Sequence, residues 1–274
     1  MTSPVTLDLQ DGIATLTLNR PTALNALSVD MMKALADATS HLQRCADLRA
    51  VVVTGAGDHF MAGGDLKDFA THLHLSPESR IATFRALIEQ YINPSVEALA
   101  ALPVPVIAQV RGACAGFGLS LVLGCDMAVA ADSAYFTTAY ASIALSGDGG
   151  VSWFLPRILG RRKAFELLLL ADRFGADEAL RLGVVNRVVP LEDLNAATDA
   201  LGSWVFANTT ADIPVSLSTR TSDMDSFVVG RPTCPVPARR YRRTAVIVNV
   251  LGMFGSAAQH RVFTTLLVNV EPSV

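Results

Sequence analysis

The sequence is poor in charged residues and contains no hydrophobic run long enough to cross a membrane as a helix. Charged residues make up 17% of the 274 residues, and the formal net charge is −3. A membrane-spanning helix needs about 20 apolar residues in succession, and nucleic-acid-binding domains are typically basic. We therefore expect neither a membrane nor a nucleic acid as a partner. The hydrophobic content of 51% favours a large buried core and an oligomer that covers additional apolar surface.

The cysteines and histidines lack the spacing of a metal site. No CxxC pair joins the four cysteines, which are Cys45, Cys114, Cys125 and Cys234. His59, His72 and His74 lie on or near a loop, and the close spacing of two of them is weak evidence for a metal ion. The N-terminal segment has no basic stretch followed by an apolar core, so we expect no signal peptide. These absences predict a cytoplasmic protein without a metal ion.

Two common glycine motifs of enzymes are also missing. The cluster Gly116-Phe117-Gly118 does not complete the G-x-G-x-x-G fingerprint of dinucleotide-binding folds. No G-x-S-x-G sequence, which would form the nucleophile elbow of an α/β-hydrolase, occurs. The sequence therefore argues against both of these enzyme classes.

Segments typical of strands and of helices alternate along the chain. Residues 5–9 and 13–18 alternate polar and apolar side chains around Asp11-Gly12, which predicts a β-hairpin. Residues 50–54 and 104–110 are short apolar runs typical of strands covered on both faces. Further segments are expected as helices at 29–42, from 77 onward, and at 119–123, 153–159, 162–170, 176–182 and 191–206, with a strand at 184–189. This alternation predicts an α/β fold with helices covering the sheets.

Local signals mark several helix boundaries. Ser28 is a candidate N-cap for the helix at 29–42, and Asp65 for a helix after the glycine-rich loop at 55–65. Ser76-Pro77 is a typical helix start. Pro94 is expected to kink or end the helix that begins there.

The stretch from Arg111 to Gly150 has the features that indicate chemistry. Gly116 and Gly118 flank Phe117 ahead of an apolar helix, and the amides at a helix start lack partners and attract a negative oxygen. Asp148 lies alone among glycines after an apolar segment. Such an amide pocket followed by an isolated carboxyl group suits carbonyl activation with proton transfer. The alternative is that Asp148 is only a turn residue.

The sequence resembles one family, the enoyl-CoA hydratase/isomerase (crotonase) superfamily, in five segments that follow in order. The segments are LNRPTALNAL at 18–27, TGAGDHFMAGGDLK at 54–67, PVIAQVRGACAGFGLSLVLGCDMAVA at 105–130, FTTAYASIALSGDGGVSWFLPRILG at 136–160 and ADEALRLGVVNRVVP at 176–190. The resemblance implies a crotonase-like fold of repeated ββα units that binds an acyl-CoA thioester. CoA would be carried as part of the substrate, without another cofactor. The family resemblance also implies a homo-oligomer, a trimer or a hexamer.

The resemblance also assigns roles to individual positions. It places an oxyanion hole, which would polarise the thioester carbonyl and stabilise an enolate, on the backbone amides of Gly64 and Phe117. It places the CoA-contacting backbone at Ala23, Leu24, Ala26, Ala62, Gly63 and Asp65. Ser120 and Tyr140 match the two glutamates that hydratases of the family use to handle water, and we expect both to line the substrate pocket. Asp148 matches the acid of the family's isomerases.

These departures favour an isomerase over a hydratase. Neither Ser120 nor Tyr140 is a competent general base near neutral pH, because serine is a poor acid and tyrosine titrates near ~10. A single carboxylate suffices for isomerisation, since it can remove a proton next to the activated carbonyl and return it further along the acyl chain. The segment around Asp148 looks most like ring-epoxide phenylacetyl-CoA isomerases and some Δ3,Δ2-enoyl-CoA isomerases.

Other interpretations remain open at this stage. The alternatives within the superfamily are an enoyl-CoA hydratase and an acyl-CoA thioester hydrolase. A dehalogenase branch uses an aspartate here as a nucleophile, but its partner histidine has no counterpart in residues 89–95. From a different class, a catalytically silent acyl-CoA-binding protein is a further alternative.

The sequence changes character after residue 208. No lysine follows Lys163, prolines cluster at 232–237, and an arginine cluster occupies 239–243. We therefore divide the chain into a crotonase-like acyl-CoA-binding core at 1–208 and a divergent C-terminal region at 209–274. One hypothesis is that the second region is an out-of-frame reading of the end of the gene. Reading the coding DNA in the other two frames tests it, since a family-like helix should appear in one of them.

Overall fold

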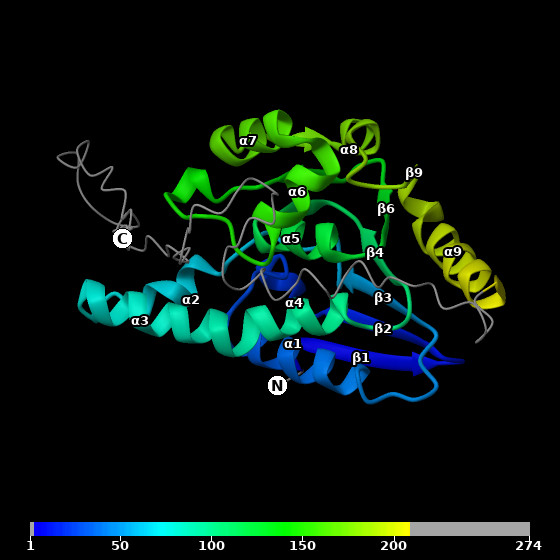
Figure 1. Cartoon of the computed structure of the whole chain (residues 1–274), viewed down its shortest axis with the longest axis horizontal. Coiled ribbons are helices and arrows are strands. Elements are labelled where there is room, and N and C mark those ends of the chain that lie inside the picture. The colour runs from blue at the N-terminus through cyan, green and yellow to red at the C-terminus, as the bar shows by residue number, and fades with distance from the viewer. Residues whose placement is uncertain (1–2, 209–274) are drawn as a thin grey trace, which may run out of the picture.

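A six-stranded sheet and a smaller three-stranded sheet, both accompanied by helices, make up the computed structural model, which describes residues 3–208 (Figure 1). The predicted α/β class is confirmed. Our division of the chain and the hypothesis about residues 209–274, including the arginine cluster, concern a region outside the described residues. No helix among the described residues is long and apolar enough to span a membrane.

The large sheet has the strand order β1-β2-β3-β4-β6-β9. Its strands are β1 (Val5–Gln10), β2 (Ile13–Leu18), β3 (Ala50–Gly55), β4 (Val106–Val110), β6 (Met127–Ala131) and β9 (Arg187–Val189). β1 and β2 are antiparallel and the other neighbours are parallel. Asp11 and Gly12 both have positive φ between β1 and β2, as a type I′ turn requires, so the predicted hairpin is confirmed.

The small sheet pairs β7 (Tyr135–Thr137) with β5 (Ala113–Ala115) on one side and β8 (Phe174–Gly175) on the other. These strands are two or three residues long, too short for a recognisable alternation of side chains. The expected strand at 184–189 is likewise reduced to the three residues of β9. The amides of Val184 and Val185 instead donate to the carbonyl oxygen of Ala179 at the end of a helix.

Nine α-helices are described, and most agree with the expected segments. They are α1 (Val29–Leu42), α2 (Leu66–Ala70), α3 (Pro77–Leu87), α4 (Asn93–Ala100), α5 (Phe117–Gly124), α6 (Val151–Leu159), α7 (Arg161–Leu170), α8 (Ala176–Leu182) and α9 (Leu194–Asn208). The two predicted caps and the predicted helix start at Ser76-Pro77 are confirmed, because the side chains of Ser28, Asp65 and Ser76 each accept hydrogen bonds from first-turn amides.

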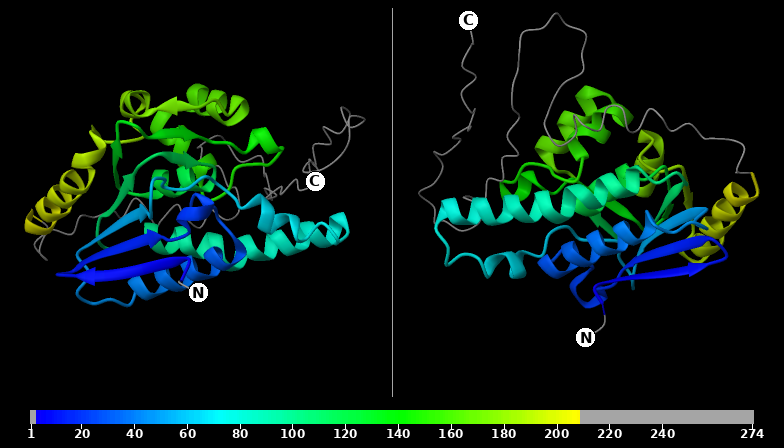
Figure 2. Two further views of the ribbon diagram at one scale, coloured as in Figure 1. Left: turned by 180° about the vertical axis from the view of Figure 1, so that it is seen from behind. Right: turned by 60° about the horizontal axis from the view of Figure 1, so that its bottom comes forward.

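Pro94 does not end the helix in which it lies. α3 passes into a π-helical turn at Ile88–Ile92 and continues as α4, so that one long helical rod results (Figures 1 and 2). Proline is tolerated in the first turn of α4 because the missing N–H is not needed there. The helix that we expected to be kinked or ended at Pro94 instead changes its hydrogen-bonding pattern locally, from α-helical to π-helical and back.

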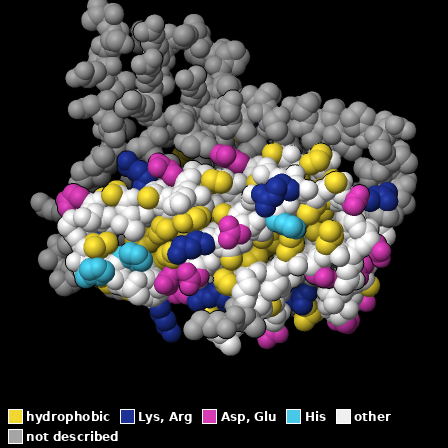
Figure 3. Space-filling view, turned by 90° about the horizontal axis from the view of Figure 1, so that it is seen from below, with side chains coloured by type: hydrophobic (Ala, Val, Ile, Leu, Met, Phe, Trp, Pro, Cys, Tyr) yellow, Lys and Arg dark blue, Asp and Glu magenta, His cyan; other side chains and the backbone are white. Residues whose placement is uncertain are grey.

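The central strand β4 is covered on both faces, as its apolar sequence predicts. Val106, Ala108 and Val110 belong to the main core with α1, α4 and α5. Ile107 points to the opposite face and packs in a second cluster with Leu194 and Leu201 of α9. Seen from below (Figure 3), hydrophobic side chains gather across the middle of the described surface, with charged side chains between and around them.

Candidate functional site

An apolar cavity of about 260 Å³ lies where the predicted site segments meet. Residues 62–64, 116–117 and 139–148 contribute to its wall. The remaining side chains come from or adjoin α1, α2 and α3 and are hydrophobic, namely Leu27, Met32, Leu66, Phe69, Phe84 and Ile88. Asp148 is the one charged residue among those that line this cavity. The cavity therefore suits an apolar group that reacts next to a single carboxyl group.

Two glycine turns are packed directly against each other at this cavity. The bridge between Met61 and Cys114 brings the two segments alongside. Gly63 and Gly116 have φ of 94° and 53°, respectively. A Cβ atom on Gly116 would lie 3.3 Å from the Cα atom of Gly63, which is tighter than an ordinary contact. The absence of side chains at both turns thus allows the backbones to approach this closely.

Each of these turns presents an unused backbone amide. Phe117 is the first residue of α5, where an N–H has no partner within the helix. Within residues 3–208, the amides of Gly64 and Phe117 donate no hydrogen bond. Both residues line the cavity. Two such amides at neighbouring turns are suited to bind an oxygen that becomes negative during a reaction.

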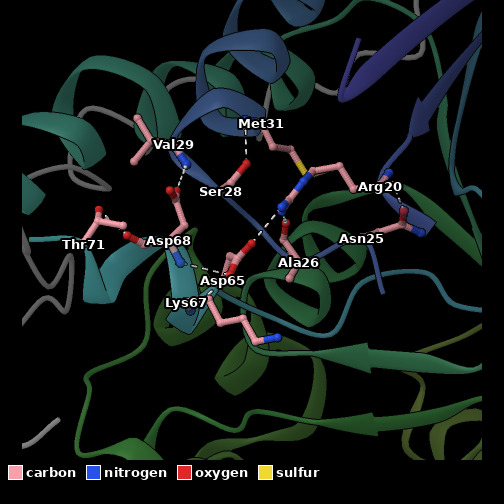
Figure 4. Close-up of polar contacts among 10 residues, drawn as sticks. All are labelled: Arg20, Asn25, Ala26, Ser28, Val29, Met31, Asp65, Lys67, Asp68 and Thr71. Carbon is pink, nitrogen blue, oxygen red and sulfur yellow. Dashed lines mark hydrogen bonds and ion pairs between the residues drawn. The ribbon is translucent and has the colours of Figure 1, made fainter. Parts of the chain in front are cut away.

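The turn that carries Gly64 is held by a polar network centred on Asp65 (Figure 4). The carboxylate of Asp65 accepts hydrogen bonds from the amides of Lys67 and Asp68, and from Arg20 at 2.8 Å. Burial alone would raise the pKa of Asp65, but the Arg20 hydrogen bond and charge and the two amides hold that pKa below its usual value. The ionised carboxylate therefore fixes the start of α2 immediately after Gly64.

A side chain of α2 binds the start of α1. Asp68 Oδ2 accepts a hydrogen bond from the amide of Val29 at 2.8 Å, while Ser28 caps the amide of Met31 in the same helix start (Figure 4). On the other side of Gly64, the amide of Leu27 donates to Gly63 and the amide of Asp65 donates to Leu27. The Gly63–Gly64 turn is thus bonded on both sides to the segment that leads into α1.

Sequence reasoning missed two residues that organise this region. The side chain of Asn25 is fully buried and binds the carbonyl oxygens of Ala56 and His59 and the amide of Arg20. Arg20 also donates to the carbonyl oxygen of Ala26. Asn25 has a positive φ of 54°, which asparagine tolerates better than most residues. Arg20 and Asn25 both lie in the segment at 18–27 that resembles the family. The resemblance did not indicate which contacts their side chains make.

The positions predicted to contact the substrate separate into two groups. Ala62 and Gly63 line the cavity, as do Gly64, Phe117, Tyr140 and Asp148. Ala23, Leu24, Ala26 and Asp65 do not line it. Leu24 is joined to the site only through the hydrogen bond from the Ala62 amide to its carbonyl oxygen, and the side chain of Asp65 is used as a cap.

Ser120 does not line the cavity, in contrast to our expectation. It lies on the fourth residue of α5 and is fully buried behind Tyr140 and Asp148. Its hydroxyl lies 2.9 Å from the Tyr140 hydroxyl and 2.9 Å from the carbonyl oxygen of Asp148. The position therefore supports the neighbouring side chains and has no direct access to a ligand.

Tyr140 and Asp148 are joined by a short hydrogen bond. The Tyr140 hydroxyl donates to Oδ1 of Asp148 at 2.6 Å. Burial raises the pKa of Asp148, although the Tyr140 hydrogen bond and one from the backbone amide of Asp148 act in the opposite direction. Burial and the adjacent Asp148 charge also raise the pKa of Tyr140 well above its ordinary value. The carboxylate of Asp148 is thus more basic than that of an ordinary aspartate, and Tyr140 keeps its proton.

The histidines that could suggest a metal have structural partners. His59 Nδ1 accepts a hydrogen bond from the amide of Ala113, and His74 contacts a carbonyl oxygen of its own turn. Among residues 3–208, no group of three or more His, Cys, Asp or Glu side chains is arranged to hold a metal ion. The polar groups that the described cavity does offer are backbone amides, hydroxyls and one carboxyl group.

Known proteins resemble this chain over the same region. The enoyl-CoA hydratase/isomerase family model matches residues 8–213. A 1,2-epoxyphenylacetyl-CoA isomerase of Escherichia coli (strain K12) is 39% identical over 186 residues, which are 68% of this chain and 70% of that protein. A 4-chlorobenzoyl coenzyme A dehalogenase-2 of Arthrobacter sp is 34% identical over 203 residues, 74% of this chain and 72% of that protein. The crystal structure of an enoyl-CoA hydratase from Polaromonas sp. JS666 has a TM-score of 0.69 and 31% identity, and the match covers 82% of this chain and 84% of that one.

Proposed function

The chain belongs to the enoyl-CoA hydratase/isomerase (crotonase) family, and we propose that it is an acyl-CoA isomerase of that family. The observation that carries the proposal is the single carboxyl group, Asp148, in an apolar cavity beside two unpaired backbone amides. Isomerisation needs one group that removes a proton and returns it elsewhere, whereas the other reactions of the family need further groups.

In the proposed reaction, the amides of Gly64 and Phe117 bind the carbonyl oxygen of the thioester. They stabilise the negative charge that this oxygen acquires when a proton leaves the adjacent carbon chain. Asp148 takes that proton as its carboxylate and gives it back at another carbon, so that a double bond moves and no atom is gained or lost. The burial that raises the pKa of Asp148 makes its carboxylate a stronger base.

Addition of water is not supported by the residues of the cavity. The positions that resemble the hydratase glutamates are occupied by Ser120 and Tyr140, and the raised pKa of Tyr140 keeps its hydroxyl protonated. Neither side chain can therefore activate water as a carboxylate does. The apolar wall with Phe69 and Phe84 also favours a hydrophobic acyl group over a hydrated intermediate.

The dehalogenase relative suggests a second use of the aspartate, as a nucleophile. Within residues 3–208, no histidine lines the cavity to support such a reaction. The matching residues 89–95, which the structure places in the π-helical turn and the start of α4, contain no histidine either. These observations favour proton transfer over nucleophilic substitution.

Incubation with a panel of 3-enoyl-CoA and aryl-acetyl-CoA-type thioesters tests the proposal. We expect at least one thioester to give a product of unchanged mass with a displaced double bond, detected by chromatography and mass spectrometry. Asp148→Asn should slow this conversion by about 10²- to 10⁴-fold, the contribution of a general acid–base. A product heavier by one water molecule, or release of free CoA, would contradict the assignment.

A further inference from the structure

We propose that Tyr140, supported by Ser120, is a positioning residue that holds Oδ1 of Asp148 and leaves Oδ2 as the oxygen that transfers the proton. This inference rests on the proposed function, because it assigns a task within the same site. It gives a role to Ser120 and Tyr140, which otherwise differ from the hydratase glutamates at the matching positions without an explanation.

Tyr140, Ser120 and Asp148 are linked by a chain of hydrogen bonds. Tyr140 donates its single hydroxyl proton to Oδ1 of Asp148 at 2.6 Å. The Ser120 hydroxyl is 2.9 Å from both the Tyr140 oxygen and the carbonyl oxygen of Asp148, and it can donate its single proton to one of them at a time. Among the described residues, Oδ2 of Asp148 has no side-chain hydrogen-bond partner. Tyr140 therefore engages Oδ1, and besides it only the backbone amide of Asp148 acts on this carboxylate among the described residues.

The chain of hydrogen bonds also ties the carboxyl group to the helix that presents a candidate oxyanion amide. Phe117 and Ser120 both belong to α5, and the Ser120 hydroxyl binds the carbonyl oxygen of Asp148 at 2.9 Å. Gly149 permits this contact, since a Cβ atom there would lie 2.7 Å from the Phe117 ring and 3.0 Å from the Ser120 Cβ. The segment that carries the base is thus bonded to the helix that presents the amide.

Among the described residues, no other charged side chain lines the cavity that contains Asp148. As far as the structure describes the chain, the wall comes from α1, α2, α3, α5 and the segments at 62–64 and 139–148, and it contains no lysine, arginine, histidine or second carboxyl group. Tyr140 is its only other titratable side chain. Tyr140 stabilises the charged form of Asp148 by its hydrogen bond, so removal of the hydroxyl should make this carboxyl group harder to ionise.

The test compares Tyr140→Phe with wild type in the pH dependence of kcat/KM for the isomerised thioester. The acidic limb, where Asp148 must lose its proton before it can act as a base, should move to higher pH. At the optimum, kcat should fall by about ten- to a hundredfold, as expected for loss of a hydrogen bond to a charged group, with little change in KM. Ser120→Ala should move the limb in the same direction by less.

Tyr135→Phe is the matched control, because Tyr135 lies on β7 outside the cavity. The acidic limb of kcat/KM for this variant should stay at the pH of wild type. Titration of ¹³C-labelled aspartate carboxyl groups, assigned with Asp148→Asn, follows the same ionisation without any need for turnover. If wild type proves inactive but the carboxyl titration moves in Tyr140→Phe, the isomerase proposal fails and the positioning role stands.

An unchanged acidic limb and an unchanged carboxyl titration in Tyr140→Phe would overturn the inference. A uniform loss of rate at every pH, without a shift of the limb, would also overturn it, because that is the signature of a purely structural role. If Tyr140→Phe does not fold, Ser120→Ala decides the question by the same two readouts.

Discussion

Asp148 is a carboxyl group that the fold keeps in an apolar cavity although its charge would be better solvated in water. Burial raises its pKa, and only the Tyr140 hydroxyl and a backbone amide oppose this effect. Such a residue destabilises the folded state when it is ionised, yet the same environment makes it a stronger base. The residue is therefore a place where stability and the proposed activity conflict.

Asp148→Asn should consequently stabilise the protein at neutral pH while it slows isomerisation. The folded-state pKa of Asp148 lies above its unfolded value, so the folded state binds the additional proton and stability falls as pH rises through the folded pKa. The variant removes this cost. Its melting temperature should exceed that of wild type at pH 7, with roughly 2–4 °C for each kcal/mol gained.

The advantage of Asp148→Asn should shrink as the pH is lowered and should vanish where Asp148 is protonated in both states. Thermal unfolding followed by circular dichroism between acid and neutral pH measures this difference. A variant that is less stable than wild type at every pH would show that the charge of Asp148 is not the cause.

Sequence reasoning identified Asp148 as a candidate but not its partners. From the sequence, a carboxyl group among glycines can equally well be interpreted as a turn residue. Only the match with a family pattern assigns a function to it. The contact between Tyr140 and Asp148 spans eight positions and that between Ser120 and Asp148 spans 28. Such contacts depend on how β7, α5 and α6 pack, and no local pattern encodes them.

At the scale of elements, the site depends on two turns that only glycine fits. Gly63 and Gly116 bring the backbones of the β5–α5 connection and the turn before α2 into contact. The unusual backbone at Gly116, with φ of 53° and ψ of −122°, directly precedes the free amide of Phe117. The geometry of the proposed oxyanion hole is thus a property of backbone packing.

Gly116→Ala should impair catalysis more than stability, and Gly160→Ala serves as its control. Both glycines have positive φ, so each substitution should cost about 1–3 kcal/mol of backbone strain. A Cβ atom at Gly160 meets nothing within 4 Å, whereas one at Gly116 presses on Gly63.

We therefore expect similar losses of unfolding free energy in chemical denaturation but a decrease in kcat/KM of roughly a hundredfold only for Gly116→Ala. Equal catalytic losses in the two variants would indicate that the separation of the turns is unimportant.

The elements themselves were largely predictable because they have strong local signals. Hairpin glycine, helix caps and apolar runs fixed the positions of β1 to β4, α1 and α3 to within a few residues. The π-helical turn before Pro94 was not predictable, since the choice between an ended helix and a widened one depends on the packing of Ile88 and Ile92 in the core. The strands β5, β7 and β8 were missed because their pairing is tertiary.

At the scale of the whole molecule, the large sheet and its helices form a scaffold with the site at one side. Much of the apolar surface is used in two core clusters on opposite faces of β4. Some hydrophobic side chains nevertheless remain outside, notably on α7, where Leu169 and Leu170 are 68% and 62% exposed. Neighbouring exposed hydrophobic side chains mark an interaction surface more often than single exposed ones do.

We predict that the chain forms a homo-oligomer in which α7 takes part. Phe165 and Leu169 are four residues apart and both more than half exposed, so they lie on the same face of this helix. Light scattering after size-exclusion chromatography should give a multiple of the 29.1 kDa chain mass. Replacement of Phe165 and Leu169 by lysine should shift the distribution toward the monomer. A monomeric wild type would refute this prediction.

The central claim is that Asp148 transfers a proton on a thioester whose carbonyl oxygen the Gly64 and Phe117 amides hold. Solvent-deuterium exchange into the bound thioester, measured by mass spectrometry for wild type and Asp148→Asn, tests it most directly. The account predicts that wild type incorporates deuterium on the carbon chain next to the carbonyl and that Asp148→Asn, with the thioester still bound, does not. Incorporation at equal rates in both proteins, or none in a wild type that binds the thioester, would contradict it.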